Sequence, residues 1–313
     1  MKKQEMAKIF QMRQSALKEH LHARLVASHG KDNVINSDGY LYAKGTHPVL
    51  LVAHMDTVHK TPPSQLFYSE DGTMAMAKEG IGGDDRCGII IILDILEKLN
   101  CLVVFCEDEE IGLVGAKKFC NAKISLDVNY AVEFDRQGSN DYVFYKDYNA
   151  KFAEFIEKFG FKNSSGSMID ISKIAPAYKI EAVNISCGYY NAHTAHEYVC
   201  FDEMADITER ATAMIAEPTG KWDYVEDKLD VYSYSKYRVL DWGQYYSPQS
   251  FLSPADYSIF RDGKEIKFGR AWMKSNGEVI VDKYAGKPLK GDVIVCDRGT
   301  GIQVDYNDIC VWY

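Results

Sequence analysis

The segment "LLVAHMDTVHK", Leu50–Lys60, determines how most of the chain is interpreted. Its first four residues are apolar and favour a strand that is buried on both faces. The chain then runs directly into His54, Asp56 and His59, whose polar side chains are costly to bury unless a partner satisfies them. The end of this strand therefore predicts a site at which an imidazole and a carboxylate have a binding partner.

Strands and helices alternate along the chain up to about residue 218. After the strand "PVLLVAH" we expect a buried helix over Asp85–Leu99, a strand at "CLVVFCE", a helix at "IGLVGAKKFC" and a strand at "YAVEFD". A helix over Asn149–Phe159, a strand at "AVNIS" and a helix over Phe201–Ala216 follow. This alternation predicts an α/β fold with a mostly parallel central sheet flanked by helices.

The segments around this alternating core are also interpretable. Apolar residues recur at helical spacing over Lys2–Ser28, which predicts one helix, and Asp38-Gly39 and Asp71-Gly72 predict two hairpin turns. After residue 219 the composition changes. Tyrosine and valine become frequent, and short turn sequences such as "RDGK" and "SNGE" recur. We therefore predict an α/β domain over residues 1–219 and a β-rich appendage over residues 220–313.

Composition excludes several classes of protein. The net charge of −9, without a basic stripe, argues against a nucleic-acid partner. No apolar run is long enough to cross a membrane, and "MKKQEMAKIF" lacks the apolar core of a signal peptide. The eight cysteines are scattered without a CxxC pair, which indicates reduced thiols. We expect a cytoplasmic protein without nucleic-acid or membrane partners, and leave homo-oligomer formation open.

Acidic residues and histidines follow the predicted strands one after another. Each cluster alone is more often an ordinary turn or a solvated loop than a site. Their recurrence at successive strand ends is different, because in open α/β sheets that edge is where ligands bind. The clusters are His54 with Asp56, Asp84 with Asp85, Glu107 to Glu110, Asp135, and His193 with His196 and Glu197. So many carboxylates would repel one another without cations, and the pattern therefore favours a metal site.

Five motifs, in this order, resemble those of the co-catalytic dizinc exopeptidases: "HMDTV", "GGDDRCG", "DEEIGLVGA", "EFDRQG" and "HTAHEYV". That family includes peptidase T, aminoacylase, carboxypeptidase G and the single-domain zinc aminopeptidases. The resemblance covers residues 48 to about 218 and leaves the remainder unexplained. It implies a zinc exopeptidase-like fold and two zinc ions per chain, with cobalt or manganese left open as the working metal.

The resemblance also implies a role for each matched residue. By this resemblance Glu109 is the general base, and Asp56 orients His54 without binding the metal itself. Residues two apart on a strand face the same side, so His54 and Asp56 are able to meet at one site. The last motif offers His193 or His196, and the spacing of the motif favours His193. The implied metal ligands, with the second of them bridging both ions, are His54, Asp84, Glu110, Asp135 and His193.

One departure from the family concerns the lid. Some of these enzymes carry an inserted lid domain between the last two ligands, but the 58 residues from Asp135 to His193 leave no room for one. Groups that hold the substrate must then come from elsewhere. Tyr190 and Asn191, with the preceding tyrosine, are candidate donors, although packing roles remain equally open. Arg136 is a candidate partner for a substrate carboxylate, unless it only neutralises the acidic rim.

These observations predict a metal-dependent hydrolase that cleaves short peptides with a metal-activated water. The activity is of exopeptidase type, that of an aminopeptidase or a di- or tripeptidase. An amidase or deacylase acting on N-acyl amino acids remains an alternative within the same chemistry. A two-metal phosphoesterase is disfavoured, because the tandem Glu109-Glu110 suits a base beside a ligand. A catalytically dead binding module is also disfavoured, because the full ligand set and the base are retained.

Overall fold

The computed structural model describes residues 1–145, 149–164 and 169–225 in full. Beyond residue 225 it describes only the backbone of six strands between residues 255 and 311. The chain divides into two compact units, Met1–Asp227 and Lys228–Tyr313, and each is considered by itself. Within the described residues, no helix is both long enough and apolar enough to cross a membrane.

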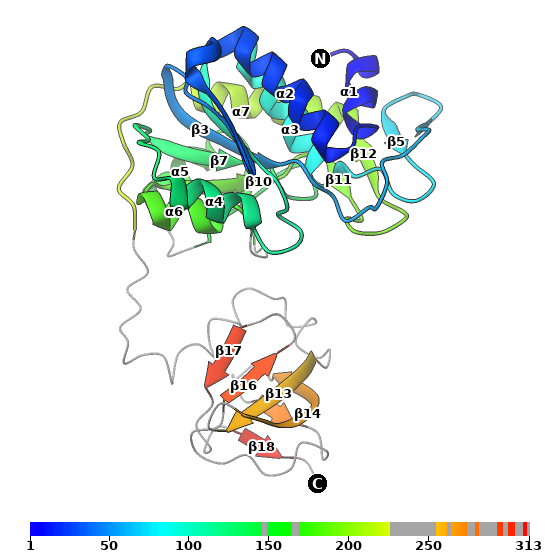
Figure 1. Ribbon diagram of the computed structural model, residues 1–313, viewed down its shortest axis with the longest axis vertical. Helices are drawn as coiled ribbons and strands as arrows, with labels where there is room; N and C mark the ends of the chain where they lie inside the picture. Colours follow the sequence, from blue (N-terminus) through cyan, green and yellow to red (C-terminus); the bar gives the residue numbers. More distant parts are fainter. Residues whose placement is uncertain are drawn as a thin grey trace. The chain divides into compact units, whose positions relative to one another are not determined.

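The first unit is built on an eight-stranded sheet (Figure 1). The strands, in spatial order, are β1 (Val34–Ser37), β2 (Tyr40–Ala43), β6 (Cys101–Cys106), β3 (His47–His54), β7 (Tyr130–Glu133), β10 (Ala182–Ile185), β8 (Asp141–Val143) and β9 (Lys162–Asn163). The four central strands, β6, β3, β7 and β10, are mutually parallel, whereas β2 and β8 join them antiparallel. The predicted α/β class with a largely parallel centre is confirmed.

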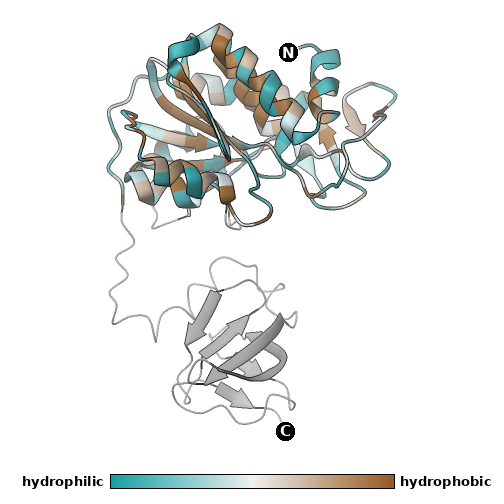
Figure 2. Ribbon diagram, in the orientation of Figure 1, coloured by the Kyte–Doolittle hydropathy of each residue, from teal (hydrophilic) through white to brown (hydrophobic). Residues whose placement is uncertain are grey.

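Helices cover both faces of this sheet (Figure 1). The helices are α1 (Lys3–Phe10), α2 (Gln14–His29), α3 (Gly83–Leu96), α4 (Val114–Ala122), α5 (Ala150–Glu157), α6 (Ile171–Tyr178) and α7 (Phe201–Ala216). The apolar residues of α1, α2, α3 and α7 join one core cluster, and those of α4 and α6 join the other. The apolar residues of the helices therefore pack against the sheet. Figure 2 shows hydrophobic residues along both the central strands and the helices.

Strand β3 shows why the sheet forms where the sequence predicts it. Leu51 and Ala53 point into one core cluster, while Leu50 and Val52 point into the other. Successive side chains of a strand alternate between the two faces, so a continuous apolar run fits only a strand that is covered on both sides. The same geometry places the carboxyl ends of the parallel strands at one edge, where their polar residues meet.

The predicted helix over Lys2–Ser28 is wrong in one respect, because α1 and α2 are separate helices. Phe10 and Leu17 are seven residues apart, a spacing that a single continuous helix would also satisfy, so the apolar pattern could not reveal the break. Tertiary packing decides it. Helix α1 packs on α3, whereas α2 packs on β1 and β2.

A second, four-stranded sheet lies beside the site. Its order is β11 (Tyr189–Tyr190), β12 (Tyr198–Cys200), β5 (Met74–Met76) and β4 (Phe67–Tyr68). Strands β4 and β5 pair antiparallel, which confirms the predicted hairpin around Asp71-Gly72. The hairpin turn at Asp38-Gly39 is likewise confirmed by the pairing of β1 with β2. The loop from β11 to β12 carries His193, so this small sheet fixes the position of that loop.

The second unit contains a six-stranded sheet. Its order is β17 (Thr300–Gln303), β16 (Val293–Cys296), β13 (Ala255–Arg261), β14 (Lys264–Met273), β15 (Val279–Val281) and β18 (Ile309–Val311). All pairs are antiparallel except that of β15 with β18. The β-rich character predicted for the C-terminal part is confirmed, while most of its connecting segments lie outside the described residues.

The boundary predicted between residues 219 and 220 stays a prediction, and one set of contacts favours a later one. The ring of Trp222 packs on Phe152 and Phe155 of α5, with centroids 5.2 and 5.5 Å away. The backbone N–H of Trp222 also donates to the carbonyl of Asn129. These contacts tie residue 222 to the first unit.

We therefore predict that a chain ending at Val225 stays soluble and folded, whereas one ending at Gly220 is less stable. Loss of the Trp222 contacts should cost about 1–3 kcal/mol, which lowers the Tm of a domain of this size by roughly 3–10 °C. Thermal unfolding of the two truncated proteins measures the difference. Aggregation of the longer fragment would show that the first unit depends on the second.

Candidate active site

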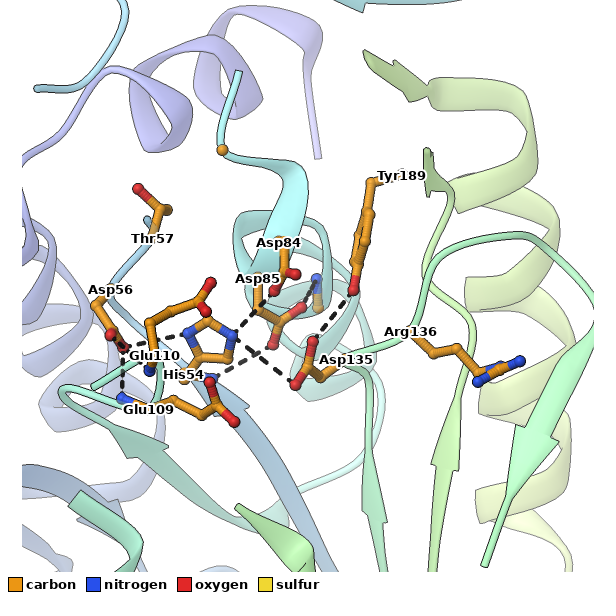
Figure 3. Close-up of polar contacts among 12 residues, drawn as sticks. His54, Asp56, Thr57, Asp84, Asp85, Glu109, Glu110, Asp135, Arg136 and Tyr189 are labelled. Atoms are coloured by element: carbon orange, nitrogen blue, oxygen red, sulfur yellow. Dashed lines mark hydrogen bonds and ion pairs between the residues drawn. The ribbon is translucent and has the colours of Figure 1, made fainter. Parts of the chain in front are cut away.

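The polar residues predicted to form a site gather at the carboxyl ends of β3, β6 and β7 and at the start of α3 (Figure 3). His54 is the last residue of β3 and is completely buried. Asp56 follows it, and Glu109 and Glu110 follow β6. Asp135 follows β7, and Asp84 lies in the first turn of α3. Four separate segments thus converge on one place.

Asp56 connects two of these segments. Its Oδ1 atom lies 3.2 Å from His54 Nδ1, where an imidazole N–H donates to it. The same carboxylate accepts the backbone N–H of Glu109 at 2.9 Å and that of Glu110 at 3.1 Å. With the proton on Nδ1, Nε2 of His54 would be free to bind a metal ion through its lone pair.

Asp84 lies between the two histidines. Its Oδ1 atom is 3.1 Å from His54 Nε2, and its Oδ2 atom is 3.1 Å from His193 Nε2. His193 Nε2 is also 3.1 Å from Glu110 Oε1, and His54 Nε2 is 3.8 Å from Asp135 Oδ2. One carboxylate therefore faces two groups of donors. His54 and Asp135 lie on one side of it, and Glu110 and His193 lie on the other.

The five predicted metal ligands are thus brought together, and their chemistry fits a metal. The ligand atoms of His54, Asp84 and Glu110 all lie within 4.8 Å of one another, and so do those of His54, Asp85 and Asp135. Imidazole nitrogen with carboxylate oxygen is a donor set that suits zinc, as well as cobalt and manganese.

The pKa values of the clustered side chains also favour a metal site. Burial, with the nearby charge of Asp84, raises the pKa of Asp135 well above its usual range. Hydrogen bonds to Asp84 and Glu110 raise the pKa of His193 to about 10. Burial lowers the pKa of His54, but the charge of Asp135 and the hydrogen bonds to Asp56 and Asp84 raise it by more. Without a metal, protons must neutralise these acids. Bound cations would do so instead, which is how the donor set fits a metal centre.

Glu197 holds the backbone around Asp84, the residue predicted to bridge the two ions. The sequence did not indicate this role. Glu197 is completely buried, and its Oε1 atom accepts the backbone N–H of Asp84 at 3.0 Å. Its Oε2 atom accepts the backbone N–H of Gly82 at 2.8 Å and lies 2.8 Å from His59 Nε2. Glu197 therefore fixes the loop that presents Asp84. Its spacing from His193 was visible in "HTAHE", but its partners are more than a hundred residues away.

Asp85 and Asn184 fix two further ligands. Asp85 is completely buried and accepts the backbone N–H groups of His54 and Gly88 at 3.3 and 3.1 Å. Asn184 on β10 donates to the carbonyl of Asp135 at 2.7 Å and accepts its N–H at 2.9 Å. The hydroxyl of Tyr189 donates to Asp135 Oδ1 at 3.2 Å (Figure 3). These contacts hold the predicted ligands His54 and Asp135 in place.

Glu109, the predicted base, lies at the edge of the cluster. Burial raises the pKa of its carboxyl group to about 7, with the charge of Asp170 adding to the shift. Both Glu109 and Glu110 line a cavity of about 680 Å³ that also contains Asp84, Asp135 and His193. This volume is within the range of about 300–1,000 Å³ that is usual for sites that bind small molecules.

Of the predicted substrate contacts, Arg136 lines the same cavity as the cluster, whereas Tyr190 and Asn191 are not among the lining residues. The guanidinium of Arg136 points away from the cluster (Figure 3) and donates to Asp141 and Ser164 at 3.1 and 2.8 Å. The hydroxyl of Tyr190 donates to Glu203 on α7, and Asn191 donates to the carbonyl of His196 at 3.3 Å. The roles predicted for Arg136, Tyr190 and Asn191 gain no support from these contacts.

Asp170 is a further acid near Glu109, whose pKa it raises. Its side chain is completely buried beside the first turn of α6, next to the thiol of Cys106. Burial raises the pKa of this group to about 6. A fully buried carboxyl group is not positioned to meet a substrate.

Comparisons of the sequence agree with this geometry. Residues 38–174 match peptidase family M28. The match includes every predicted ligand except His193. A peptidase T-like protein of Yersinia pestis is 27% identical over 146 residues, which are 44% of this chain. That alignment spans 32% of the relative, so this chain matches about a third of the length of that protein.

Solved structures with a similar fold are also peptidases. Aminopeptidase PepT from Bacillus cereus has a TM-score of 0.51 at 16% identity, with 68% of this chain and 96% of that chain covered. A Staphylococcus aureus tripeptidase has a TM-score of 0.54 at 13% identity, with 67% and 95% covered. A TET aminopeptidase from a thaumarchaeote has a TM-score of 0.56 at 11% identity, with 68% and 96% covered.

At these identities the structures establish the fold and no more. The fold is similar to that of these aminopeptidases and the tripeptidase. The match to peptidase family M28 and the peptidase T-like relative agree with the predicted resemblance to exopeptidases.

The geometry separates the two histidines of "HTAHE". His193 faces Asp84 and Glu110, whereas the exposed side chain of His196 makes no hydrogen bond or ion pair within the described part of the chain. We predict that His193→Ala loses a metal and nearly all activity, while His196→Ala keeps both. Metal analysis of the two purified variants decides between them. The opposite result would place the ligand three residues later.

We also predict that Glu197→Gln weakens metal binding by about 10- to 100-fold, the usual effect of removing a group that orients a ligand. Glutamine leaves only one oxygen acceptor where the carboxylate serves Gly82, Asp84 and His59. Competition with a chelator measures the affinity. Glu209→Gln, on the exposed face of α7, is the matched control. An unchanged affinity in Glu197→Gln would mean that the loop needs no such support.

Proposed function

We propose that this protein is a metal-dependent exopeptidase that hydrolyses amide bonds of short peptides. One observation carries the proposal: Asp84 faces His54 with one oxygen and His193 with the other, and the carboxylate Glu109 is close by. An arrangement of two donor groups around a shared carboxylate suits a pair of metal ions. The family match and the peptidase T-like relative support the assignment to peptide hydrolysis.

We propose two zinc ions per chain, with cobalt or manganese as other metals that this donor set accepts. His54 and Asp135 would hold one ion, Glu110 and His193 the other, and Asp84 both. When bound, the metals would activate a water molecule and polarise the carbonyl of the scissile amide. Asp56 would keep the proton on Nδ1 of His54, so that the lone pair of Nε2 is free to bind a metal ion.

Glu109 is proposed to move the proton. Its backbone is held by Asp56, and its carboxylate borders the cavity beside the ligands. Burial raises its pKa to about 7, and a general base works best with a pKa near the operating pH. In the proposed reaction a Glu109 oxygen accepts a proton from water and then delivers it to the leaving amine.

The cavity argues for a small substrate. Its volume of about 680 Å³ accommodates a short peptide rather than a folded chain. Lys117, Lys173, Tyr145 and Asn184 lie among its lining residues. The proposed substrates are therefore di- and tripeptides. Homo-oligomer formation and a cytoplasmic location stay predictions.

The assignment is tested with a panel of dipeptides, tripeptides, amino-terminally acetylated peptides and N-acyl amino acids, each assayed with and without added zinc. An aminopeptidase should require a free amino terminus, because acetylation removes the group it recognises. Preferred cleavage of N-acyl amino acids would instead identify a deacylase. No hydrolysis of any member by the metal-loaded protein would contradict the proposal.

The base is tested separately. Glu109→Gln keeps the shape of the side chain but cannot accept a proton, so kcat should fall by about 10²- to 10⁴-fold. The metal content should remain that of the unmodified protein, because Glu109 is not among the proposed ligands. Glu154→Gln, an exposed change on α5, controls for the loss of one charge. Near-normal turnover in Glu109→Gln would remove this residue from the mechanism.

A further inference from the structure

A second cavity, of about 420 Å³, lies next to Asp56 and is separate from the one described above. Its wall is formed by the turn between α1 and α2, by the loop after β3, and by Arg86 on α3. The proposed reaction uses none of these residues except Asp56. Several of them are positively charged, although the whole chain carries a net charge of −9.

Arg86 is the most constrained of these groups. Its side chain is only 4% exposed, and its Nη2 atom donates to the carbonyl of Met12 at 3.2 Å. Its Nε and Nη1 atoms are buried without an acceptor, and it forms no ion pair within the described part of the chain. A guanidinium cannot lose its charge in a protein, so a buried one with unused donors is costly unless an anion is near.

The amino terminus of α2 meets Arg86 at the same turn. This helix has 16 residues, its N-cap residue Arg13 supplies no side-chain cap, and its first turn contains no acid. The backbone N–H groups of Gln14, Ser15 and Ala16 therefore have no acceptor among the described residues. The positive end of a helix dipole and unsatisfied N–H groups form a ready site for an anion. Met12, which accepts from Arg86, lies directly before this helix end.

The two acidic side chains in the wall already have hydrogen-bond or ion-pair partners. Glu107 pairs with Lys18 at 2.6 Å and accepts the backbone N–H of Gly39. Asp56 accepts from His54 and from two backbone N–H groups. By contrast, the exposed cations Arg13 and Lys60 make no ion pair or side-chain hydrogen bond in the described part of the chain. Asp56 and Asp85 lie near enough to attract Arg86. Because Arg13 and Lys60 have no such partner, positive charge remains in excess among the side chains that line this cavity.

We propose that this cavity binds an oxyanion, a carboxylate or a phosphate, held by the amino terminus of α2 together with Arg86, Arg13 and Lys60. Two sources have this chemistry. One is the free carboxylate of a short peptide, which would make the cavity a specificity subsite; this source rests on the proposed peptidase function. The other is a free inorganic anion, which does not depend on that function. In both cases the bound anion lies beside Asp56, which positions His54 and the Glu109 backbone.

The first arm of the test uses inorganic phosphate as the probe. Isothermal titration calorimetry of the full-length, metal-loaded protein at constant ionic strength gives its Kd. The double variant Arg13→Ala/Lys60→Ala should bind phosphate at least about tenfold more weakly, since both cations are exposed and their loss leaves the core intact. Lys98→Ala/Lys151→Ala, exposed and equal in charge change, is the control and should bind as the unmodified protein does. Phosphate bound at the metals would be unaffected by either double variant.

The second arm compares peptides that end in a carboxylate with the same peptides ending in a carboxamide. A substrate carboxylate in the cavity predicts that kcat/KM falls about tenfold or more on amidation, and that the double variant loses this preference. If no peptide is hydrolysed, the proposed function fails and the phosphate arm decides alone. The proposal is overturned if neither phosphate binding nor the carboxylate preference differs between the unmodified protein and Arg13→Ala/Lys60→Ala.

Discussion

The carboxylate of Asp56 is the contact on which the rest of the site depends. Strands β3 and β6 run parallel, with His54 opposite Cys106, so the residues that follow each strand emerge side by side. Asp56 spans this gap by accepting from His54 and from the backbone of Glu109 and Glu110. One side chain thereby sets the orientation of the first imidazole together with the directions of the proposed base and the proposed ligand beside it.

The sheet holds the residues that make this contact in fixed positions. The central strands are covered on both faces by helices, and close packing leaves their carboxyl ends little freedom to shift. The loops that follow these strands therefore begin at fixed positions. Hydrogen bonds from their backbones to Glu197, Asp85 and Asn184 then restrict the loops themselves. The predicted ligands are therefore held in place, which reduces the ordering that metal binding must bring about.

The sequence predicts much of the fold because its signals are local. Continuous apolar strands, glycine-containing turns and the helical pattern of Phe201–Ala216 all follow from spacing along the chain. The break between α1 and α2 does not, since the two helices pack on different elements.

The proposed ligands were predictable for a similar reason, because each belongs to a short motif at the end of a strand. Long-range contacts were not. Glu197 reaches Gly82 and Asp84, and Arg136 turns to Asp141 and Ser164, through pairings that no local pattern records. The excess positive charge near Arg86 emerges only when the turn before α2 and the start of α3 are seen together.

The most direct test of the account is anomalous diffraction at the zinc absorption edge from crystals of the zinc-loaded protein. The account predicts two anomalous peaks, one on each side of Asp84, with His54 and Asp135 at the first and Glu110 and His193 at the second. A single peak, or peaks that do not share Asp84, would contradict it.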